Sequence, residues 1–268
     1  MLELLSAHED LPSINAEELF HIGPFTVANS TVFTVFAIAS FIVLAILARK
    51  FKLIPTKFQH MLEMMYEYLL DLFTNIVGTK DRAKKVLPYA GSVFLYILFS
   101  NLVPMIPGIM SFTYTGEEGV AVPLMRGGTA DFNTTFGLAL AAVVTVQILA
   151  IAERGVFGHL GHFIQIKPII TGFKKSIGEG FIGIVHFFVG LIEIVGELAK
   201  VISLSLRLFG NMFAHEVLTI IIMGALAVGI PVIWMGMGVL VGAVQAIVFT
   251  SLITVYYSLV LNKEGEKH

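Results

Sequence analysis

The sequence contains no cysteine, little charge and no excess of either sign. Without cysteine, disulfide bonds, thiolate metal sites and cysteine nucleophiles are excluded. Charged residues make up 13% of the 268 residues, whereas an average soluble domain has about a quarter. The 17 basic and 19 acidic residues give a formal net charge of −2, which supplies no basic surface for nucleic acid. These scarcities argue against an ordinary soluble domain and against a nucleic-acid-binding protein.

Apolar sequence is abundant. Hydrophobic residues make up 56% of the chain and the mean hydropathy is +0.87. Uncharged stretches long enough to cross a bilayer core of about 30 Å alternate with short charged ones. We therefore expect one all-α integral membrane domain over residues 1–268. Its predicted parts are an acidic N-terminus at 1–25, three upright spans at 26–48, 86–107 and 132–152, and two longer helices at 177–223 and 232–262.

The two longer helices exceed the roughly 20 residues of a perpendicular crossing, so we expect them to be strongly tilted and to form a hairpin. Basic residues predict the orientation. Eight lie between positions 49 and 85, four between 154 and 175 and two after 262, while Arg126 stands alone in the loop after the second span. Residues 1–25 are acidic and do not resemble a signal peptide. The positive-inside rule then places the N-terminus outside and the C-terminus in the cytoplasm.

Residues 58–77 show a different pattern. Apolar residues recur at helical spacing, and Glu63, Glu67 and Asp71 follow one another at intervals of four. This pattern is typical of an amphipathic helix lying at the cytoplasmic interface. A helix packed on a partner protein fits the pattern equally well.

Five charges interrupt the otherwise apolar stretch 181–223: Glu193, Glu197, Lys200, Arg207 and Glu216. Each unpaired charge at the centre of a span costs about 2.5 to 3.5 kcal/mol, so these groups must be paired, hydrated or facing protein. At about 100° per residue, seven polar residues fall within an arc of about 80°. They are His186, Glu193, Glu197, Lys200, Arg207, Asn211 and His215. Glu216 lies on the opposite side from Arg207, so the helix has one polar surface around Arg207 and another around Glu216.

Arg207 has no acid at 203, 204, 210 or 211. Because arginine stays charged in proteins, it is a permanent cation that attracts a carboxylate from another helix. Glutamate and histidine, in contrast, exchange protons and can form a relay in a membrane. A hairpin centred near 226–228 brings Gln245 to the depth of Arg207, where its amide oxygen can accept an arginine hydrogen bond.

Two structural alternatives remain open. Glu193, Glu197 and Lys200 can form a buried network that only holds helices together. Gln245 can form an ordinary interhelical hydrogen bond.

These residues form a family pattern. Ser203–Glu216, reading SLSLRLFGNMFAHE, resembles the signature of subunit a of F-type ATP synthase, the stator channel of its membrane sector. Further matches follow in colinear order over most of the chain. They are NLVPMIPG at Asn101–Gly108, TADFNTTFGLAL at Thr129–Leu140, Glu193 and Lys200 before the signature, and Gln245 followed by ITVYYSL.

The resemblance implies a role for each matching residue. Arg207 faces a ring of c subunits, whose essential carboxylate passes it during rotation, and it prevents protons from passing directly between two offset aqueous half-channels. Gln245 lies near this arginine. Glu216 relays protons in the outer half-channel, which Asn211 also lines, and Glu193 lies toward the cytoplasmic half-channel. The residues expected on the proton path or facing the c-ring are Arg207, Glu216, His215, Asn211, Gln245, Glu193, Glu197 and Lys200.

The chain departs from the family pattern at one position. Some relatives pair the relay acid with a histidine on the last helix, seven residues before the glutamine, and here that position is Gly238. His215 sits beside Glu216 instead, and we hypothesise that it compensates. The resemblance further implies a cell inner-membrane subunit with no catalytic site, cofactor or metal of its own. Its implied partners are the c-ring, the b-subunit peripheral stalk, the other ATP synthase subunits and the lipid bilayer.

Two other classes of protein would use different residues of this sequence. A secondary transporter would use Arg207 to bind an anionic substrate, but the chain is short and shows no repeated half. An intramembrane metalloprotease would use His159 and His162, which lack the HExxH pattern. The coupling ion depends mainly on the c subunit, and the proton is the family default.

Overall fold

The computed structural model describes residues 16–23, 25–49, 55–106, 108–109, 112–115, 121–156, 177–225 and 229–262. Within these residues, five helices are long and apolar enough to cross a membrane by length and composition. This confirms the predicted all-α integral membrane fold. The chain divides into two compact units, described separately here: residues 1–135 with 206–254, and residues 136–205 with 255–268.

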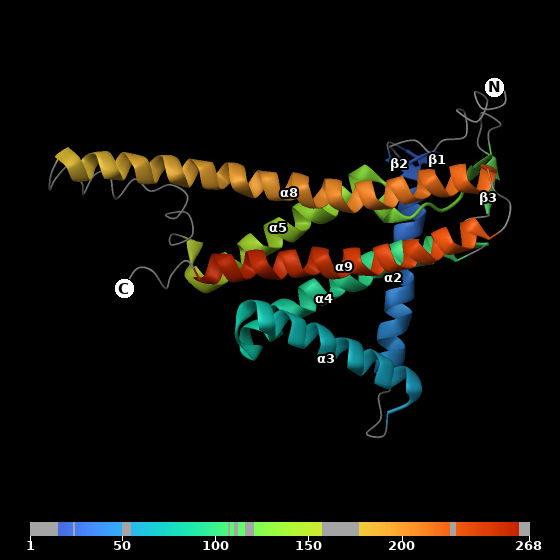
Figure 1. Ribbon diagram of the computed structural model, residues 1–268, viewed down its shortest axis with the longest axis horizontal. Coiled ribbons are helices and arrows are strands. Elements are labelled where there is room, and N and C mark those ends of the chain that lie inside the picture. Colours follow the sequence, from blue (N-terminus) through green and yellow to red (C-terminus); the bar gives the residue numbers. More distant parts are fainter. Residues whose placement is uncertain are drawn as a thin grey trace. The chain divides into compact units, whose positions relative to one another are not determined.

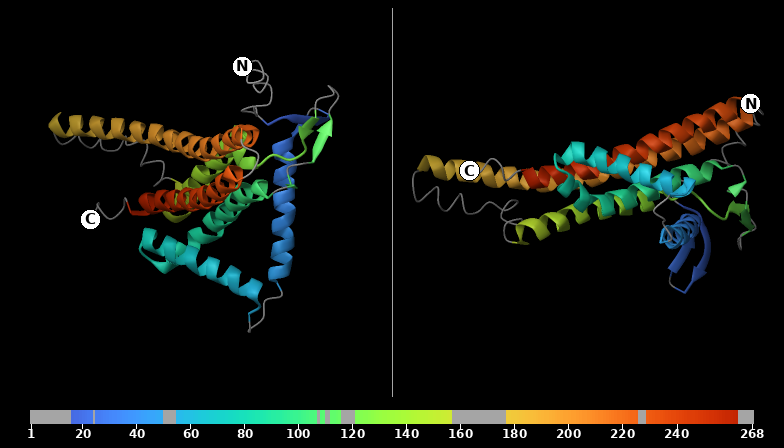
Figure 2. Two further views of the ribbon diagram at one scale, coloured as in Figure 1. Left: turned by 45° about the vertical axis from the view of Figure 1, so that its right-hand side comes forward. Right: turned by 90° about the horizontal axis from the view of Figure 1, so that it is seen from below.

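Three helices begin the first unit: α2 (Asn29–Ala48), α3 (Lys57–Val77) and α4 (Lys80–Leu102). Thr56 caps α3, since its side chain accepts a hydrogen bond from the Gln59 N–H at 3.3 Å. Gly78 ends α3 with a φ of +83°, a left-handed conformation that glycine adopts without strain. The chain therefore turns sharply, and α3 and α4 form a helical hairpin that widens toward α2 (Figures 1 and 2).

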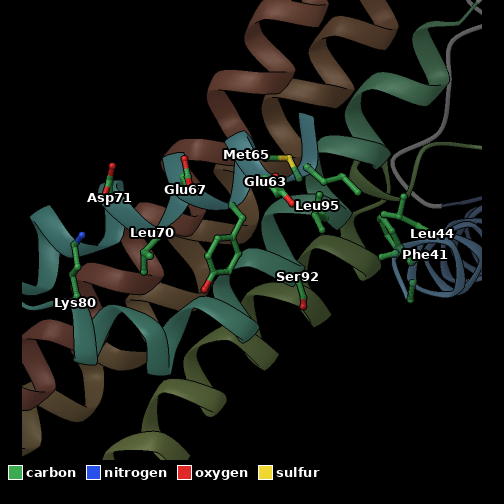
Figure 3. Close-up of a pocket in the computed structure, with 14 residues that line it drawn as sticks. Phe41, Leu44, Glu63, Met65, Glu67, Leu70, Asp71, Lys80, Ser92 and Leu95 are labelled. Carbon is green, nitrogen blue, oxygen red and sulfur yellow. The ribbon is translucent and has the colours of Figure 1, made fainter. Parts of the chain in front are cut away.

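An aromatic cluster joins α2 to α4. Phe99 of α4 lies with its ring centroid 5.3 to 6.0 Å from those of Phe33, Phe36 and Phe41 on α2. Phe33 is fully buried. Such tilted aromatic pairs contribute about 0.5 to 1.5 kcal/mol each beyond their buried area. Phe41 also lines a cavity of about 830 Å³ that lies among α2, α3 and α4 (Figure 3).

Two short antiparallel hairpins were not predicted. One pairs β1 (Glu18–Ile22) with β2 (Phe25–Ala28), and the other pairs β3 (Thr113–Thr115) with β4 (Ala121–Pro123). Because β2 is as apolar as the helix that follows, the sequence pattern merged the two, and α2 begins at Asn29 rather than at 26.

The second membrane helix is longer than the uncharged stretch 86–107. It begins at Lys80, and its first turns contain the basic residues Lys80, Arg82, Lys84 and Lys85. After Leu102 it continues into the 3-10 helix η1 (Val103–Met105), which contains Pro104. A hydropathy pattern breaks at charge, whereas a helix can continue through it.

Asp131 explains the start of α5 (Phe132–Arg154). Its carboxylate accepts hydrogen bonds from the N–H groups of Asn133 and Thr134 at 3.2 and 3.3 Å, and from the Thr134 hydroxyl at 2.8 Å. This is N-terminal capping by an aspartate. The Ser30 hydroxyl donates to the same carboxylate at 3.0 Å, so the cap also ties α5 to α2.

The last two helices are α8 (Ile177–Ala225, 49 residues) and α9 (Ile230–Asn262, 33 residues). At about 1.5 Å per residue they are roughly 74 and 50 Å long, well beyond a hydrocarbon core of about 30 Å. The C-terminal part of α8 and most of α9 belong to the first unit. The preceding part of α8, with most of α5 and the end of α9, forms the second unit, where side chains such as Ile192 and Val195 are more than 60% exposed.

Candidate functional site

A cavity of about 390 Å³ opens inside the first unit. Its walls are the C-terminal end of α4, the loop from Pro123 to Ala130, α8 around Met212–Ile220, and Met235 of α9. Most of its lining is apolar. Its ionisable side chains are Arg126, His215 and Glu216.

Arg126 and Glu216 form an ion pair in this cavity. Arg126 Nη2 lies 3.0 Å and Nε 3.3 Å from Glu216 Oε2, so one carboxylate oxygen accepts both hydrogen bonds. The other oxygen, Oε1, accepts no hydrogen bond within the described parts of the chain. The side chain of Arg126 is 5% exposed and that of Glu216 is 31% exposed. A charge pair this sheltered from solvent is screened less than a surface pair.

Two glycines allow the Arg126 loop to pack closely against α4. A Cβ at Gly127 would lie 2.9 Å from Pro104 Cγ and 3.3 Å from the Ser100 oxygen, and one at Gly128 would lie 2.9 Å from the Tyr96 hydroxyl. The 3-10 helix η3 (Gly128–Ala130) follows directly. The loop is therefore held against the helix rather than projecting from it.

His215 lies beside the ion pair. Its imidazole stacks on the Trp234 ring of α9, with centroids 5.3 Å apart and an interplanar angle of 13°. The Trp234 indole N–H donates to the Thr219 hydroxyl at 3.1 Å, which fixes the indole on α8. A Cβ at Gly238 would overlap the His215 imidazole. The imidazole of α8 thus fills the space that any larger residue at position 238 would need.

Of the two pairings that the sequence left open for Gln245, the structure contains the interhelical hydrogen bond. The Gln245 amide oxygen accepts a hydrogen bond from Asn211 Nδ2 at 2.8 Å, not from Arg207. Asn211 lies one turn after Arg207 on the same helix, so the shorter amide spans the α8–α9 interface while the guanidinium points outward. Arg207 is exposed and forms no ion pair with any residue that the structure describes. The Gln245 side-chain nitrogen is buried with no partner among the described residues.

In the second unit, Lys200 Nζ lies 2.5 Å from Glu197 Oε1 and 4.8 Å from the centroid of the Tyr256 ring. The Glu197–Lys200 part of the proposed α8 network is therefore formed. Glu193 is partly exposed one turn earlier, and His186 is exposed.

The acidic row of α3 borders a different cavity. Glu63, Glu67 and Asp71 line the space of about 830 Å³ among α2, α3 and α4. In Figure 3, Glu67 and Asp71 point away from α4, whereas Leu70 points toward it. Glu63 accepts a hydrogen bond from the Gln59 amide at 2.8 Å. These acids are not part of the Glu216 cavity.

The structure adds no evidence for the metalloprotease hypothesis. The histidines at 159 and 162 lie outside the described residues. Among the residues that are described, no group of three or more His, Asp or Glu side chains is placed to hold a metal ion.

Sequence reasoning missed Arg126 as a member of the site. The sequence pattern presents Arg126 only as a single basic residue in a loop outside the membrane, because its partner is 90 positions away along the chain. The signal that could have found it is the Gly127–Gly128 pair that follows it, since adjacent glycines permit close backbone packing.

The fold and this site define a polytopic helical membrane protein with ionisable groups inside its spans, an arrangement typical of ion and proton pathways. The family model described as ATP synthase A chain matches residues 30–258. The chain belongs to this ATP synthase subunit a family.

Curated relatives agree with the family model. ATP synthase subunit a of Moorella thermoacetica is 32% identical over 244 residues, covering 90% of this chain and 93% of that protein. The subunit a of Protochlamydia amoebophila is 34% identical over 82% of this chain and 75% of its own length. That of Geotalea daltonii is 33% identical over 85% and 86%. Membership of the family makes this chain a membrane component of ATP synthase rather than a catalytic subunit, and it implies proton translocation.

Proposed function

We propose that this chain carries protons through the membrane sector of an F-type ATP synthase by two half-channels that lead to the c-ring carboxylate. Arg207 separates the half-channels, so that proton flow must turn the ring and thereby drives ATP synthesis. The observation that carries the proposal is the cavity of about 390 Å³ that is lined by both Glu216 and His215, two groups able to exchange protons.

The outer half-channel is assigned to this cavity. A carboxylate and an imidazole in an otherwise apolar lining are the groups through which protons pass in membrane pumps and transporters. Glu216 offers Oε1 as the accepting atom, because Oε2 is held by Arg126. Water in the cavity would connect the two side chains to the outer surface.

His215 is assigned the relay role that some relatives give to a histidine on the last helix. The geometry supports this substitution, since the His215 imidazole occupies the space next to Gly238 and stacks on α9 through Trp234. The His215 imidazole therefore lies next to position 238, where those relatives carry their histidine, although His215 belongs to α8 and not to α9.

Arg207 is assigned to the c-ring surface. Its side chain is exposed and has no acidic partner in the described residues, so a carboxylate from another subunit can approach it. The Asn211–Gln245 hydrogen bond joins α8 to α9 one turn away. This bond holds the backbone that carries Arg207 without neutralising its charge.

The inner half-channel is assigned to Glu193, Glu197 and Lys200, by resemblance and by the Glu197–Lys200 pair. We also propose that the N-terminus lies outside and the C-terminus in the cytoplasm, that α8 and α9 lie strongly tilted against the c-ring, and that α3 lies at the cytoplasmic interface. The partners proposed are the c-ring and the b-subunit peripheral stalk.

The test uses inverted membrane vesicles that contain the whole complex. ATP should acidify the vesicle interior, and an uncoupler should abolish the signal whether or not sodium is present. ATP-driven sodium uptake that persists in the presence of the uncoupler, without acidification, would reject the proton as coupling ion. A secondary transporter would instead bind a solute alone and would not copurify with a c-ring, so copurification separates the two functions.

A further inference from the structure

We propose that Arg126 is a positioning residue of the outer half-channel: it holds one oxygen of the Glu216 carboxylate and leaves the other as the atom that accepts the proton. The inference rests on the proposed function of Glu216. Sequence reasoning and the family resemblance gave Arg126 no role, and only the fold brings it to Glu216.

The geometry of the pair is directional. Both Nε and Nη2 of Arg126 donate to Oε2 of Glu216, at 3.3 and 3.0 Å. A lysine could also neutralise the carboxylate, but a guanidinium fork with two donors fixes its orientation as well. The carboxylate is therefore held by one side, and no described residue donates a hydrogen bond to Oε1.

The loop fixes Arg126 independently of Glu216. The Arg126 N–H donates to the Asn29 oxygen at 3.4 Å, and Asn29 begins α2. The next two residues are glycines packed against Pro104 and Tyr96 of the α4 region. The backbone of Arg126 is thus anchored on α2 and α4, whereas Glu216 belongs to α8. A protonation change at Glu216 would leave the backbone that carries its partner held by these contacts.

The surroundings of Glu216 favour a role for this cation. The carboxylate borders an apolar cavity with His215 as the neighbouring ionisable group on its own helix. An ionised carboxylate in such a place needs a partner, because an unpaired buried charge is strongly unfavourable. Arg126 supplies a permanent positive charge and carries no proton itself. Proton transfer is thereby left to Glu216 and His215.

The test measures passive proton conduction through the membrane sector after the catalytic sector has been removed from vesicles. Conduction is expressed per assembled complex. Arg126→Gln should lower it by about tenfold to a hundredfold, the size expected when a reacting group loses its orientation. Arg126→Lys should retain a large part of the native proton conduction, since the positive charge remains. Lys84→Gln is the matched control, because Lys84 is an exposed cation on α4, and it should conduct as the native complex does.

The second arm separates positioning from packing. In a Glu216→Gln background, Arg126→Gln should cause no further loss, because its effect acts through the carboxylate. An equal loss in both backgrounds, or loss of assembled complex in both Arg126→Gln and Arg126→Lys, would make Arg126 structural and overturn the inference. Native conduction in Arg126→Gln with failure in Glu216→Gln would overturn it while leaving the proposed function intact. Native conduction in Glu216→Gln would instead reject the proposed function.

Discussion

Two arginines of the first unit differ in almost every respect. Arg126 comes from a loop, is 5% exposed and donates two hydrogen bonds to Glu216. Arg207 comes from the middle of α8, is exposed, and has no ion-pair partner among the residues that the structure describes. Both carry a charge that no accessible pH removes.

The difference teaches where each charge finds its partner. A buried arginine without an acid would be strongly unfavourable, so Arg126 requires Glu216 from its own chain. An exposed arginine on a membrane helix also requires compensation in the bilayer, and for Arg207 none of the described residues supplies it. Under the proposed function, the fixed relay needs the paired Arg126, and the moving c-ring carboxylate needs an arginine that is free to receive it.

The largest effect is expected when Arg207 is replaced. Arg207→Ala should abolish both ATP synthesis and ATP-driven proton pumping, because no permanent cation would then separate the half-channels. Arg207→Lys should also fail, since an ammonium can lose its proton where a guanidinium does not. Both are measured as synthesis and acidification in vesicles with equal amounts of assembled complex. Coupled synthesis that survives in Arg207→Ala membranes would reject the mechanism.

The second-largest effect is expected when the partner of Arg126 is changed. Glu216→Gln removes the proton-accepting carboxylate and should slow translocation by about a hundredfold or more, the contribution typical of a general acid or base. Because glutamine can still accept from Arg126 through its amide oxygen, the complex should assemble. Proton pumping and the quantity of complex in the membrane check the two halves of this prediction. Loss of the complex would show that Glu216 is structural.

Sequence reasoning predicted the residues that share one helix. The period of 3.6 residues is enough to place Arg207 and Asn211 on one face of α8 and Glu216 on another. It did not predict Arg126–Glu216, because that contact closes over 90 residues and depends on the packing of a loop against α4. It also left the partner of Gln245 open, since depth in a hairpin cannot distinguish Arg207 from Asn211 one turn away, and the structure pairs Gln245 with Asn211.

A smaller effect should follow when Arg207 is made to resemble Arg126. Asn211→Asp places a carboxylate four residues after Arg207, where the two side chains are neighbours on the helix surface. A partner within the chain would compete with the c-ring carboxylate, and we expect coupled synthesis to fall by about tenfold, equivalent to about 1.4 kcal/mol. Asn211→Ala is the control, because it removes the hydrogen bond to Gln245 without adding charge. Equal losses in the two variants would show that the hydrogen bond, not the charge on Arg207, matters.

The smallest effect is expected when His215, the residue before Glu216, is replaced. His215→Ala should lower proton-driven synthesis severalfold to about tenfold, below the range of a principal general acid or base, because Glu216 remains. Gly238→Ala should produce a similar loss by another route, since its Cβ would displace the imidazole from the same place. Trp234→Phe keeps a ring against His215 and is the control for stacking. If synthesis is unchanged in His215→Ala, His215 is not a relay, and the Arg126–Glu216 pair serves the outer half-channel without an imidazole.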